Sequence, residues 1–307
     1  MLTTTIRWSR LPLSLAGVWL VATGCAAIPA ISQGPLPTPG PSACANVTER
    51  FAVIGDYGKA SQPEADVAAL VASWSPDFVV SAGDNNYPLG EAGTIDANIG
   101  QYYHAFIAPY QGAYGPGASE NRFFPVLGNH DWYTDAAAAY LDYFTLPGNE
   151  RYYDLVRGPV HLFVLDSDSS EPDGISADSV QAEWLRAGLA ASQSPWQMVV
   201  MHHPPYTSGE RGPVEVLRWP FADWGADVVI TGHDHFYERL EVDGIPYVIN
   251  GLGGNSIYAF STPVPESRLR FNGDFGAQYV EAGTDCISLR FFTRAGVLVD
   301  ELVLRSN

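Results

Sequence analysis

Short runs of apolar residues recur from residue 51 onward, and each run ends in glycine or in a cluster of polar residues. Because a short apolar run bounded by turn residues is typical of a strand buried on both faces, these runs predict strands. The predicted strands span residues 51–54, 78–81, 123–127, 161–165, 197–201 and 227–230. Segments with apolar residues at helical spacing lie between them and predict helices at residues 62–74, 135–144, 176–192 and 214–224. The alternation indicates an α/β protein whose sheet is covered by helices on its faces.

The last part of the chain changes to paired apolar runs that are joined by tight turns. Residues 239–249 are interrupted by Asp243-Gly244, and residues 286–304 are interrupted by Ala295-Gly296. Such pairs between two strand-like runs are hairpin signals, so a second, more antiparallel sheet is predicted. Residues 253–280 lack a pattern of this kind, and we expect a long irregular loop there.

Polar residues with metal-binding chemistry follow five of the predicted strands. They are Asp56 in GDYG, Asp84 and Tyr87 in GDNNY, Asn129 and His130 in GNHD, His202 in VVMHH, and His233 and His235 in GHDH. In an open α/β sheet, ligands bind beyond the carboxyl ends of the strands. The five clusters are therefore expected to converge in space.

Each cluster taken alone has an ordinary structural explanation. A Gly-Asp pair after a strand is commonly a turn, and an Asn-His pair is commonly held by backbone hydrogen bonds. The GHDH cluster is harder to explain in this way, because two imidazoles flank a carboxylate and histidine is the commonest metal ligand. One shared site explains all five clusters. Its oxygen and nitrogen ligands, without thiolate, suit a pair of first-row metals that catalyses hydrolysis.

The order of the blocks GDYG, GDNNY, GNHD, VVMHH and GHDH resembles the calcineurin-like metallophosphoesterases, and within them the purple acid (tartrate-resistant) phosphatases. The resemblance covers residues 51 to about 250. It implies an α/β fold, a four-layer sandwich of two mixed β-sheets flanked by helices, with a binuclear metal centre at the strand ends. It also implies an enzyme that hydrolyses small phosphate esters by attack of a metal-bound hydroxide on phosphorus.

The resemblance assigns a role to each polar residue of the blocks. Asp84 would bridge the two metals. Asp56, Tyr87 and His235 would hold the first metal, and Asn129, His202 and His233 would hold the second. His130 would be the outer acid that contacts the phosphate, with Asp131 orienting it. His203 is a weaker candidate for the same catalytic neighbourhood, and an ordinary loop histidine is the alternative.

One departure separates the branches of the family. Many metallophosphoesterases carry Asp-x-His in the first block, whereas here Asp56 is followed by Tyr57 and Gly58. In the purple branch the phenolate of a tyrosine such as Tyr87 fills the vacant position and binds ferric iron. Hard anionic oxygen ligands favour a trivalent ion, so Fe(III) is expected beside Tyr87. The second metal stays open between Fe(II), Zn(II) and Mn(II).

The most direct interpretation is a phosphomonoesterase of the acid phosphatase type. Two alternatives stay open: a phosphodiesterase or nucleotidase that uses the same centre, and a metal-binding surface protein with redox activity and no hydrolysis. The net charge of −18, with only 16 Lys and Arg, argues against a nucleic-acid partner. Arg211, which follows the His202 block, is a candidate for reaching a substrate phosphate.

The N-terminus has the character of an export signal. Residues 1–24 combine two early arginines with an apolar stretch too short to span a bilayer. Cys25 resembles the lipidated cysteine of a bacterial lipoprotein, and a soluble secreted protein is the alternative. Residues 25–48 are expected to form a Pro-rich tether and residues 49–307 the catalytic domain. The protein is therefore expected outside the cytoplasm, touching a membrane only through a lipid on Cys25. The sequence does not indicate the oligomeric state.

Two further cysteines bear on the compartment. Cys44 precedes the first strand and Cys286 lies in a late strand. In an oxidising compartment they could pair, and two unconnected thiols are the alternative.

Overall fold

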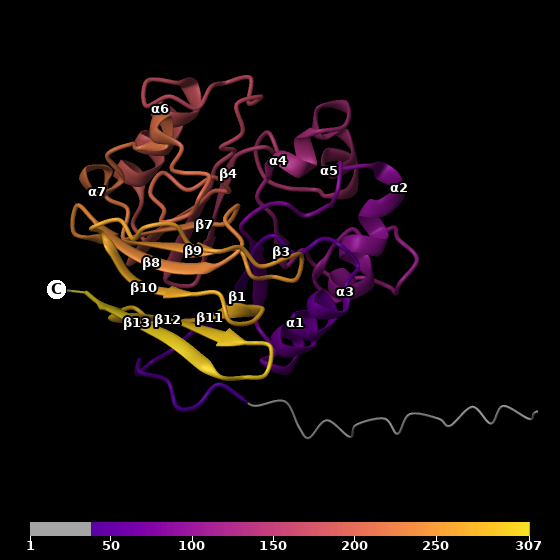
Figure 1. Ribbon diagram of the computed structural model, residues 1–307, viewed down its shortest axis with the longest axis horizontal. Coiled ribbons are helices and arrows are strands. Elements are labelled where there is room, and N and C mark those ends of the chain that lie inside the picture. Colours follow the sequence, from indigo (N-terminus) through magenta and orange to yellow (C-terminus); the bar gives the residue numbers. More distant parts are fainter. Residues whose placement is uncertain (1–37, 307) are drawn as a thin grey trace, which may run out of the picture. The chain divides into compact units, whose positions relative to one another are not determined.

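The computed structural model describes residues 38–306. The predicted export signal, Cys25 and the first part of the predicted tether lie outside these residues. Figure 1 shows the arrangement of the elements. The α-helices are α1 Gln62–Ser73, α2 Ala92–Ile95, α3 Gln101–Tyr103, α4 Asn129–Trp132, α5 Ala138–Tyr143, α6 Val180–Ala191 and α7 Phe221–Trp224. A π-helix, Asp96–Gly100, joins α2 to α3, and 3-10 turns occupy His104–Phe106, Asp135–Ala137 and Glu215–Leu217.

The first sheet has six strands in the order β13-β12-β11-β1-β2-β3. Its three early strands run parallel to one another, and β1 pairs antiparallel with β11 on its other side. The bounds are β1 Glu49–Ile54, β2 Phe78–Ser81, β3 Phe123–Phe124, β11 Gly276–Ala282, β12 Cys286–Thr293 and β13 Leu298–Arg305. The sheet is therefore mixed, with its parallel half supplied by the first part of the chain.

The second sheet has seven strands in the order β10-β8-β9-β7-β6-β5-β4. Its centre is parallel from β5 through β6 and β7 to β9, and antiparallel strands lie on both sides. The bounds are β4 Tyr153–Arg157, β5 Val160–Val164, β6 Trp196–Val200, β7 Val228–Thr231, β8 Tyr237–Val242, β9 Ile245–Asn250 and β10 Ser267–Phe271. The predicted hairpin at Asp243-Gly244 joins β8 to β9 and is confirmed.

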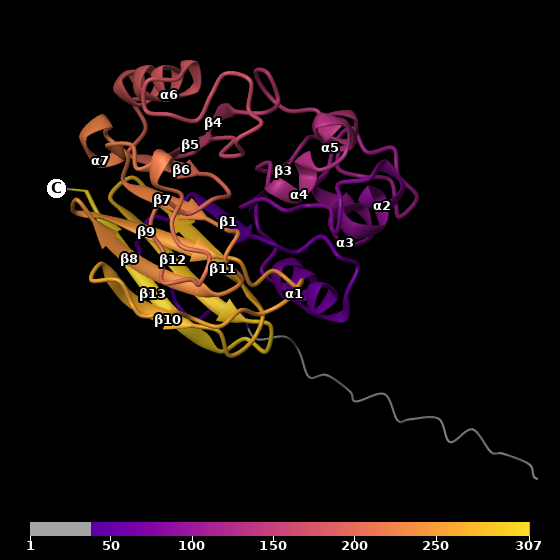
Figure 2. The same cartoon turned by 45° about the horizontal axis from the view of Figure 1, so that its top comes forward.

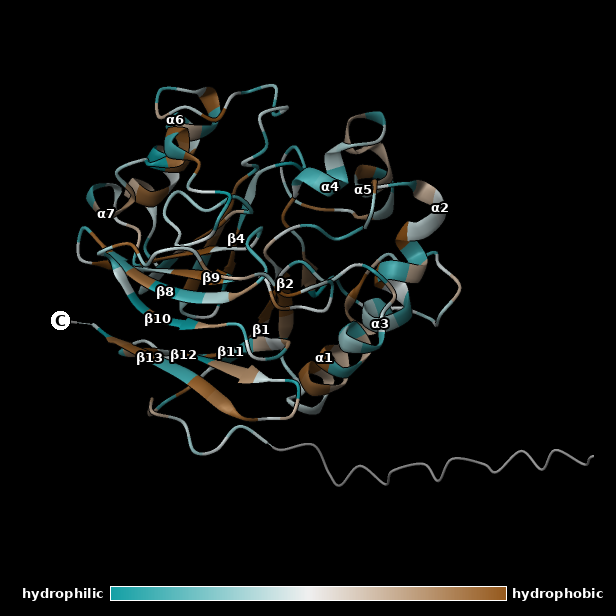
Figure 3. Ribbon diagram, in the orientation of Figure 1, coloured by the Kyte–Doolittle hydropathy of each residue, from teal (hydrophilic) through white to brown (hydrophobic). Residues whose placement is uncertain are grey.

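The two sheets pack face to face and helices cover their outer faces. One cluster of buried apolar side chains contains residues of both sheets and of α1, and a second lies between the second sheet and the pair α6 and α7. Figure 2 shows α6 and α7 on one side of the sheets and α1 to α5 on the other. In Figure 3 the hydrophobic ribbon colours are found in central strands such as β1 and β9. The predicted four-layer α/β sandwich is confirmed.

The two long helices each begin after a serine that caps the first turn. The Ser61 and Ser179 hydroxyls cap α1 and α6, each accepting a hydrogen bond from a backbone N–H of the first turn. The predicted helix at 214–224 is wrong, because only a 3-10 turn and the four-residue α7 form there, on either side of Pro220. The predicted helix at 135–144 starts late, since residues 135–137 have positive φ.

The prediction of an irregular loop at 253–280 is wrong in its second half. Residues 267–271 form β10, and residues 276–282 form β11, which lies between β12 and β1 and is buried throughout. The pattern hid β11 because polar residues interrupt its apolar run although every residue of the strand is buried. Glu281 is one of them, and it pairs with Arg290 at 2.6 Å and with Arg50 at 3.4 Å.

A disulfide joins Cys44 to Cys286, as the first of the two sequence alternatives predicted. Cys286 begins β12, and Cys44 lies just before β1, so the bond ties the N-terminal segment to the first sheet. Within residues 38–306 no helix combines the length and apolar character needed to cross a membrane.

We expect the double variant Cys44→Ala/Cys286→Ala to unfold more easily than the wild type. The bond closes a loop of 242 residues, and such a link restricts the unfolded chain, which typically contributes about 2–4 kcal/mol. Urea unfolding followed by tryptophan fluorescence measures the difference. With reductant present the two proteins should unfold together, and equal midpoints without reductant would contradict the prediction.

Candidate metal centre

The five polar loops meet at one edge of the sandwich, where the parallel strands of both sheets end. Asp56 follows β1, Asp84 and Tyr87 follow β2, and Asn129 begins α4 shortly after β3. From the second sheet, His202 follows β6, while His233 and His235 follow β7. The predicted convergence is therefore present in the structure.

Three of these residues have a backbone conformation that favours glycine. Asp56, Asp84 and His233 have φ of 55°, 54° and 68°. A left-handed conformation costs a non-glycine residue about 1–2 kcal/mol, and it persists where the surroundings hold it in place. Here the His233 N–H donates to Asp56 Oδ2 at 2.9 Å, which joins the loops of the two sheets. Such strain is concentrated at functional sites.

The first group of side chains consists of Asp56, Asp84, Tyr87 and His235. The Tyr87 hydroxyl lies 2.7 Å from Asp84 Oδ2, 3.1 Å from Asp56 Oδ1 and 3.2 Å from His235 Nε2. His235 Nε2 is also 3.2 Å from Asp56 Oδ1. All four side chains are buried, and Tyr87 is only 6% exposed. Four potential metal donors thus face one small volume.

The second group consists of Asn129, His202 and His233. His233 Nδ1 lies 3.0 Å from Asn129 Oδ1 and 3.2 Å from His202 Nε2, and the last two atoms are also 3.2 Å apart. Asp84 Oδ1 is 3.3 Å from His202 Nε2, while Asp84 Oδ2 accepts from Tyr87. Asp84 therefore faces both groups, as a bridging carboxylate must.

Hydrogen bonds from outside the two groups orient the imidazoles. His202 Nδ1 donates to the Ala82 carbonyl at 2.8 Å, and His235 Nδ1 contacts the Ser256 hydroxyl at 2.7 Å. These contacts leave Nε2 of each ring to face the group. A fixed ring orientation and tautomer is a usual property of histidines that bind metals. The donor atoms and their supports thus fit a pair of metal ions.

The charges inside the site are shifted by burial and by one another. Burial alone would lower the pKa of His202, but the Asp84 carboxylate outweighs it and raises the pKa to about 10. Burial would raise the pKa of Asp84, yet the neighbouring His202 brings it well below its usual range. Burial, and then the Asp84 and Asp56 carboxylates, raise the pKa of Tyr87 well above its usual value. Without a metal the phenol therefore keeps its proton.

The missing imidazole at position 58 has a steric explanation. A Cβ on Gly58 would overlap the backbone carbonyl of Asn85, so no side chain fits there in this arrangement of loops. The Gly58 carbonyl instead accepts a hydrogen bond from the Tyr87 N–H at 2.7 Å. The close approach of Gly58 to the 85–87 backbone therefore both excludes a side chain at position 58 and positions Tyr87.

The predicted catalytic residues lie beside the two groups in different ways. His130 packs its ring on Tyr87, with ring centres 4.3 Å apart, and its side chain is 24% exposed. Its Nδ1 lies 2.6 Å from the Pro88 carbonyl, and its Nε2 lies 3.9 Å from Asp84 Oδ2. His203 contacts the Ser167 hydroxyl at 3.0 Å and faces the His233 ring. Burial, and then the charge of His202, lower the pKa of His203 to about 3, so it is neutral.

Asp131 is placed differently from the expectation that it orients His130. Its carboxylate accepts hydrogen bonds from the Gly128 N–H at 2.9 Å and from the Asn85 amide at 2.9 Å. The His130 ring is held by Pro88 instead. Asp131 therefore ties the segment after β3 to the loop after β2. The prediction that Asp131 orients His130 is wrong, because the carboxylate points to Asn85 and Gly128 and not to the His130 ring.

Comparison with known proteins agrees with this geometry. The model of the calcineurin-like phosphoesterase family matches residues 49–237, more than half of the chain. The chain belongs to the calcineurin-like phosphoesterase family. It is a phosphoester hydrolase, and the resemblance to the purple acid phosphatases is confirmed.

Individual relatives of this phosphoesterase include acid phosphatases. Tartrate-resistant acid phosphatase type 5 of Mus musculus is 26% identical over 298 residues, which cover 83% of this chain and 86% of that protein. The structure of purple acid phosphatase PPD1 from yellow lupin seeds gives a TM-score of 0.69 at 18% identity, covering 85% of this chain and 54% of that chain. GAP50, the anchor in the inner membrane complex of Plasmodium, gives 0.65 at 19% identity, covering 85% and 90%. At these identities the two structures show the shared fold alone.

Three further residues, Arg211, Ser256 and Tyr258, lie around the site of this phosphoesterase, and the sequence did not predict that they lie together. Ser256 supports His235, and the Tyr258 ring stacks on His235 with centres 4.0 Å apart. Arg211 approaches His233 Nε2 at 3.4 Å and donates to the Tyr258 hydroxyl at 3.0 Å. Only Arg211 was singled out, from its position after the His202 block. Ser256 and Tyr258 lie in the segment without a pattern, so no sequence signal indicated them.

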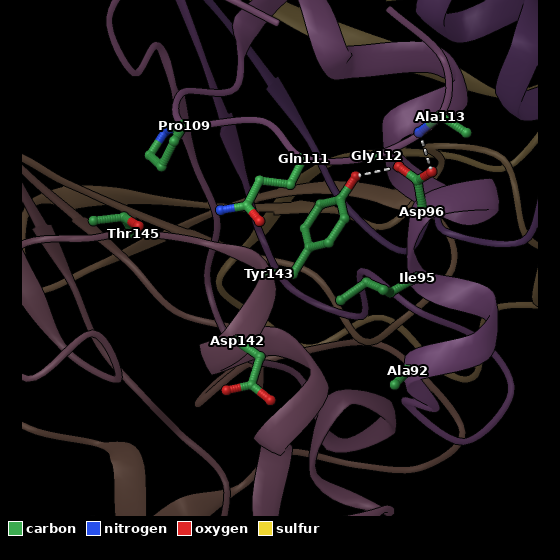
Figure 4. A pocket seen from close by; sticks show the side chains of 10 residues that line it. All are labelled: Ala92, Ile95, Asp96, Pro109, Gln111, Gly112, Ala113, Asp142, Tyr143 and Thr145. Carbon is green, nitrogen blue, oxygen red and sulfur yellow. Dashed lines mark hydrogen bonds between the residues drawn. The ribbon is translucent and has the colours of Figure 1, made fainter.

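Two cavities differ in their relation to the site. One of about 340 Å³ includes Arg211, Asp234 and Tyr258 in its lining and so adjoins the metal-binding groups. A larger one of about 510 Å³ lies among α2, α5 and the 109–113 loop, and Figure 4 shows the Tyr143 hydroxyl directed at Asp96 there. None of the predicted site residues lines the larger cavity, so its size does not make it the place of reaction.

We expect binding of a divalent metal to release at least one proton. His202, with a pKa of about 10 in the metal-free site, must lose its proton to become a ligand, so apparent affinity should rise with pH by about tenfold per unit between pH 5 and 7. Calorimetric titration with Mn²⁺ in two buffers of different ionisation enthalpy measures the release. Titration into buffer alone is the control, and equal heats in the two buffers would contradict the expectation.

Proposed function

We propose that this phosphoesterase is an exported phosphomonoesterase of the acid phosphatase type, with a binuclear Fe(III)–M(II) centre. The observation that carries the proposal is the position of the Tyr87 hydroxyl, 2.7–3.2 Å from Asp84, Asp56 and His235. A loop aromatic without a role in binding has no reason to direct its hydroxyl between two buried carboxylates. Small phosphate esters are the proposed substrates, and no nucleic-acid partner is proposed.

The residues that would hold each metal follow from the two groups. Asp56, Tyr87 and His235 would hold the first metal, Asn129, His202 and His233 would hold the second, and Asp84 would bridge them. When bound, the metal pair supplies Lewis acidity toward a phosphoryl group and activates water. The second metal is proposed as Fe(II), Zn(II) or Mn(II), because amide oxygen and imidazole suit all three.

A trivalent first metal is supported by the charge of its ligands. Asp56, Asp84 and an ionised Tyr87 present three anionic oxygens in a buried volume, and burial, followed by the two carboxylates, raises the pKa of the phenol. A strongly charged cation is needed to stabilise the phenolate there. Hard oxygen donors of this kind select a hard ion, and Fe(III) meets both requirements.

His130 is proposed as the acid that protonates the leaving oxygen. A backbone carbonyl can only accept a hydrogen bond, so the contact with Pro88 places a proton on Nδ1. Nε2 then remains to take up a proton and to give it to the alcohol that leaves. The partial exposure of the ring keeps it in contact with solvent protons. His203, neutral and packed on His233, is proposed only as a neighbouring support.

Export is proposed from the N-terminal sequence and from the disulfide. Disulfides persist in oxidising compartments, and Cys44–Cys286 closes the described domain at its N-terminal end. Cys25, outside the described residues, remains the proposed position of a lipid if the protein is anchored. If Cys25 carries no lipid, the export signal would be cleaved off near this residue and the protein would be secreted in soluble form.

We expect the iron-loaded wild type to absorb in the visible range and Tyr87→Phe to lose this band. The absorption arises from charge transfer between phenolate and ferric iron, and phenylalanine has no oxygen to bind. Absorption spectra with parallel iron analysis measure the change. Tyr133→Phe is the matched control, because its hydroxyl contacts Asn129 rather than the first group. A colourless wild type that binds iron at full occupancy would refute the ferric assignment.

We expect His130→Ala to lower kcat by about 10²–10⁴-fold for an alkyl phosphate, the usual effect of losing a general acid. The loss should be smaller for 4-nitrophenyl phosphate, because nitrophenolate leaves without protonation. Steady-state kinetics on both esters measures the difference. His104→Ala is a control, since that ring contacts the Gly100 carbonyl outside the site. Equal losses for the two esters would exclude the proton-donor role.

A further inference from the structure

We propose that the cavity beside the metal centre binds the leaving group of the ester, and that Arg211 selects leaving groups that carry a second anionic group. The anionic group would be a carboxylate or a second phosphate, which share the oxygen pair that a guanidinium recognises. The inference rests on the proposed function, because it names the substrate class of the same site.

The cavity lies beside the loop that carries His233 and His235. Its volume is about 340 Å³, and it is lined by Glu210, Arg211, Asp234, Phe236, Ile257, Tyr258 and Ala259. Asp234 lies between His233 and His235 in the chain, and Tyr258 stacks on His235. A volume of this size suits a small organic group and no large polymer. Phe236, Ile257 and Ala259 give its wall an apolar part.

The Arg211 guanidinium forms no ion pair with a carboxylate of residues 38–306. Arg151, Arg239 and Arg294 bind acidic side chains at 2.7–3.1 Å. Within residues 38–306 no carboxylate lies within ion-pair distance of Arg211, whose partners are His233 and the Tyr258 hydroxyl and ring. An exposed guanidinium of this kind can bind a carboxylate or phosphate through two parallel hydrogen bonds.

The acidic residues in the lining do not satisfy this cation. The Asp234 carboxylate is buried and accepts a hydrogen bond from the Thr207 hydroxyl at 2.5 Å. Glu210 is exposed and adjacent to Arg211 in the chain, and it forms no ion pair with it. The guanidinium therefore remains available to an anion that enters the cavity from solvent.

The placement of Arg211 favours the leaving group over the transferred phosphoryl group. Its guanidinium faces His233 Nε2, whereas Asn129 and His202 face Nδ1 on the other side of that ring. The width of an imidazole thus separates Arg211 from Asn129 and His202. A phosphoryl group held on the Nδ1 side of the ring leaves the Nε2 side, where Arg211 lies, to the group at the other end of the ester.

The test compares three aryl phosphates: phenyl phosphate, 3-carboxyphenyl phosphate and 1,3-phenylene bisphosphate. We expect Arg211→Met to lower kcat/KM for the two charged esters about five- to tenfold more than for phenyl phosphate, because the lost contact is charged but exposed. The ratio between wild type and variant cancels intrinsic differences in reactivity. Comparing the losses for 3-carboxyphenyl phosphate and 1,3-phenylene bisphosphate shows whether Arg211 prefers a carboxylate or a phosphate as the second anionic group.

Two further variants separate the contact from a general effect. Arg270→Met is the matched control, since Arg270 likewise forms no ion pair within residues 38–306, packs on Phe260 and should show no selective loss. Arg211→Lys should recover part of the preference, because it restores the charge without the paired donors. Raising the salt concentration should reduce the wild-type preference for the charged esters.

The outcomes distinguish this inference from the proposed function. Equal losses for all three esters would mean that Arg211 contacts the transferred phosphoryl group, and the inference would be wrong. Unchanged kinetics for all three in Arg211→Met would also overturn it. If the metal-loaded wild type does not hydrolyse phenyl phosphate, the proposed function fails and the inference fails with it.

Discussion

The close contact between the loop after β1 and the loop after β2 is the constraint on which the candidate metal centre depends. Gly58 lies so near the backbone of Asn85 that a side chain would overlap it, and its carbonyl accepts the Tyr87 N–H. This contact removes the space for an imidazole after Asp56 and brings the Tyr87 hydroxyl beside Asp56, Asp84 and His235. The same close approach thus accounts for both the glycine at position 58 and the position of the Tyr87 hydroxyl.

The buried carboxylates beside the Tyr87 hydroxyl then require a cation to balance their charge. Asp56 and Asp84 are buried, and within residues 38–306 their charged partners are histidines rather than Lys or Arg. Burying carboxylates without a strong positive partner costs several kcal/mol for each charge. The proposed metal pair would supply that charge, and it would allow a chain with a net charge of −18 to hold a phosphate dianion.

The sequence was sufficient for features that depend on neighbours along the chain. Apolar runs ending in Gly-Asp, Gly-Asn or Gly-His marked the strand ends, and their convergence followed from the rules of parallel sheets. It was not sufficient where folding supplies the partner. The strand β11 was missed because Glu281 meets Arg290 and Arg50 only in the sheet, and Ser256 supports His235 from 21 residues further along without a motif. The inward turn of Asp131 likewise depends on Asn85, which comes from another loop.

The most direct test of the account is a crystal structure of the iron-loaded protein with anomalous data collected at the iron edge. The account predicts an iron peak within about 2 Å of the Tyr87 hydroxyl oxygen, a normal metal–oxygen bond length, with Asp56, Asp84 and His235 completing the ligands. An iron ion bound by Asp56, Asp84 and His235 with Tyr87 turned away from it would contradict the account.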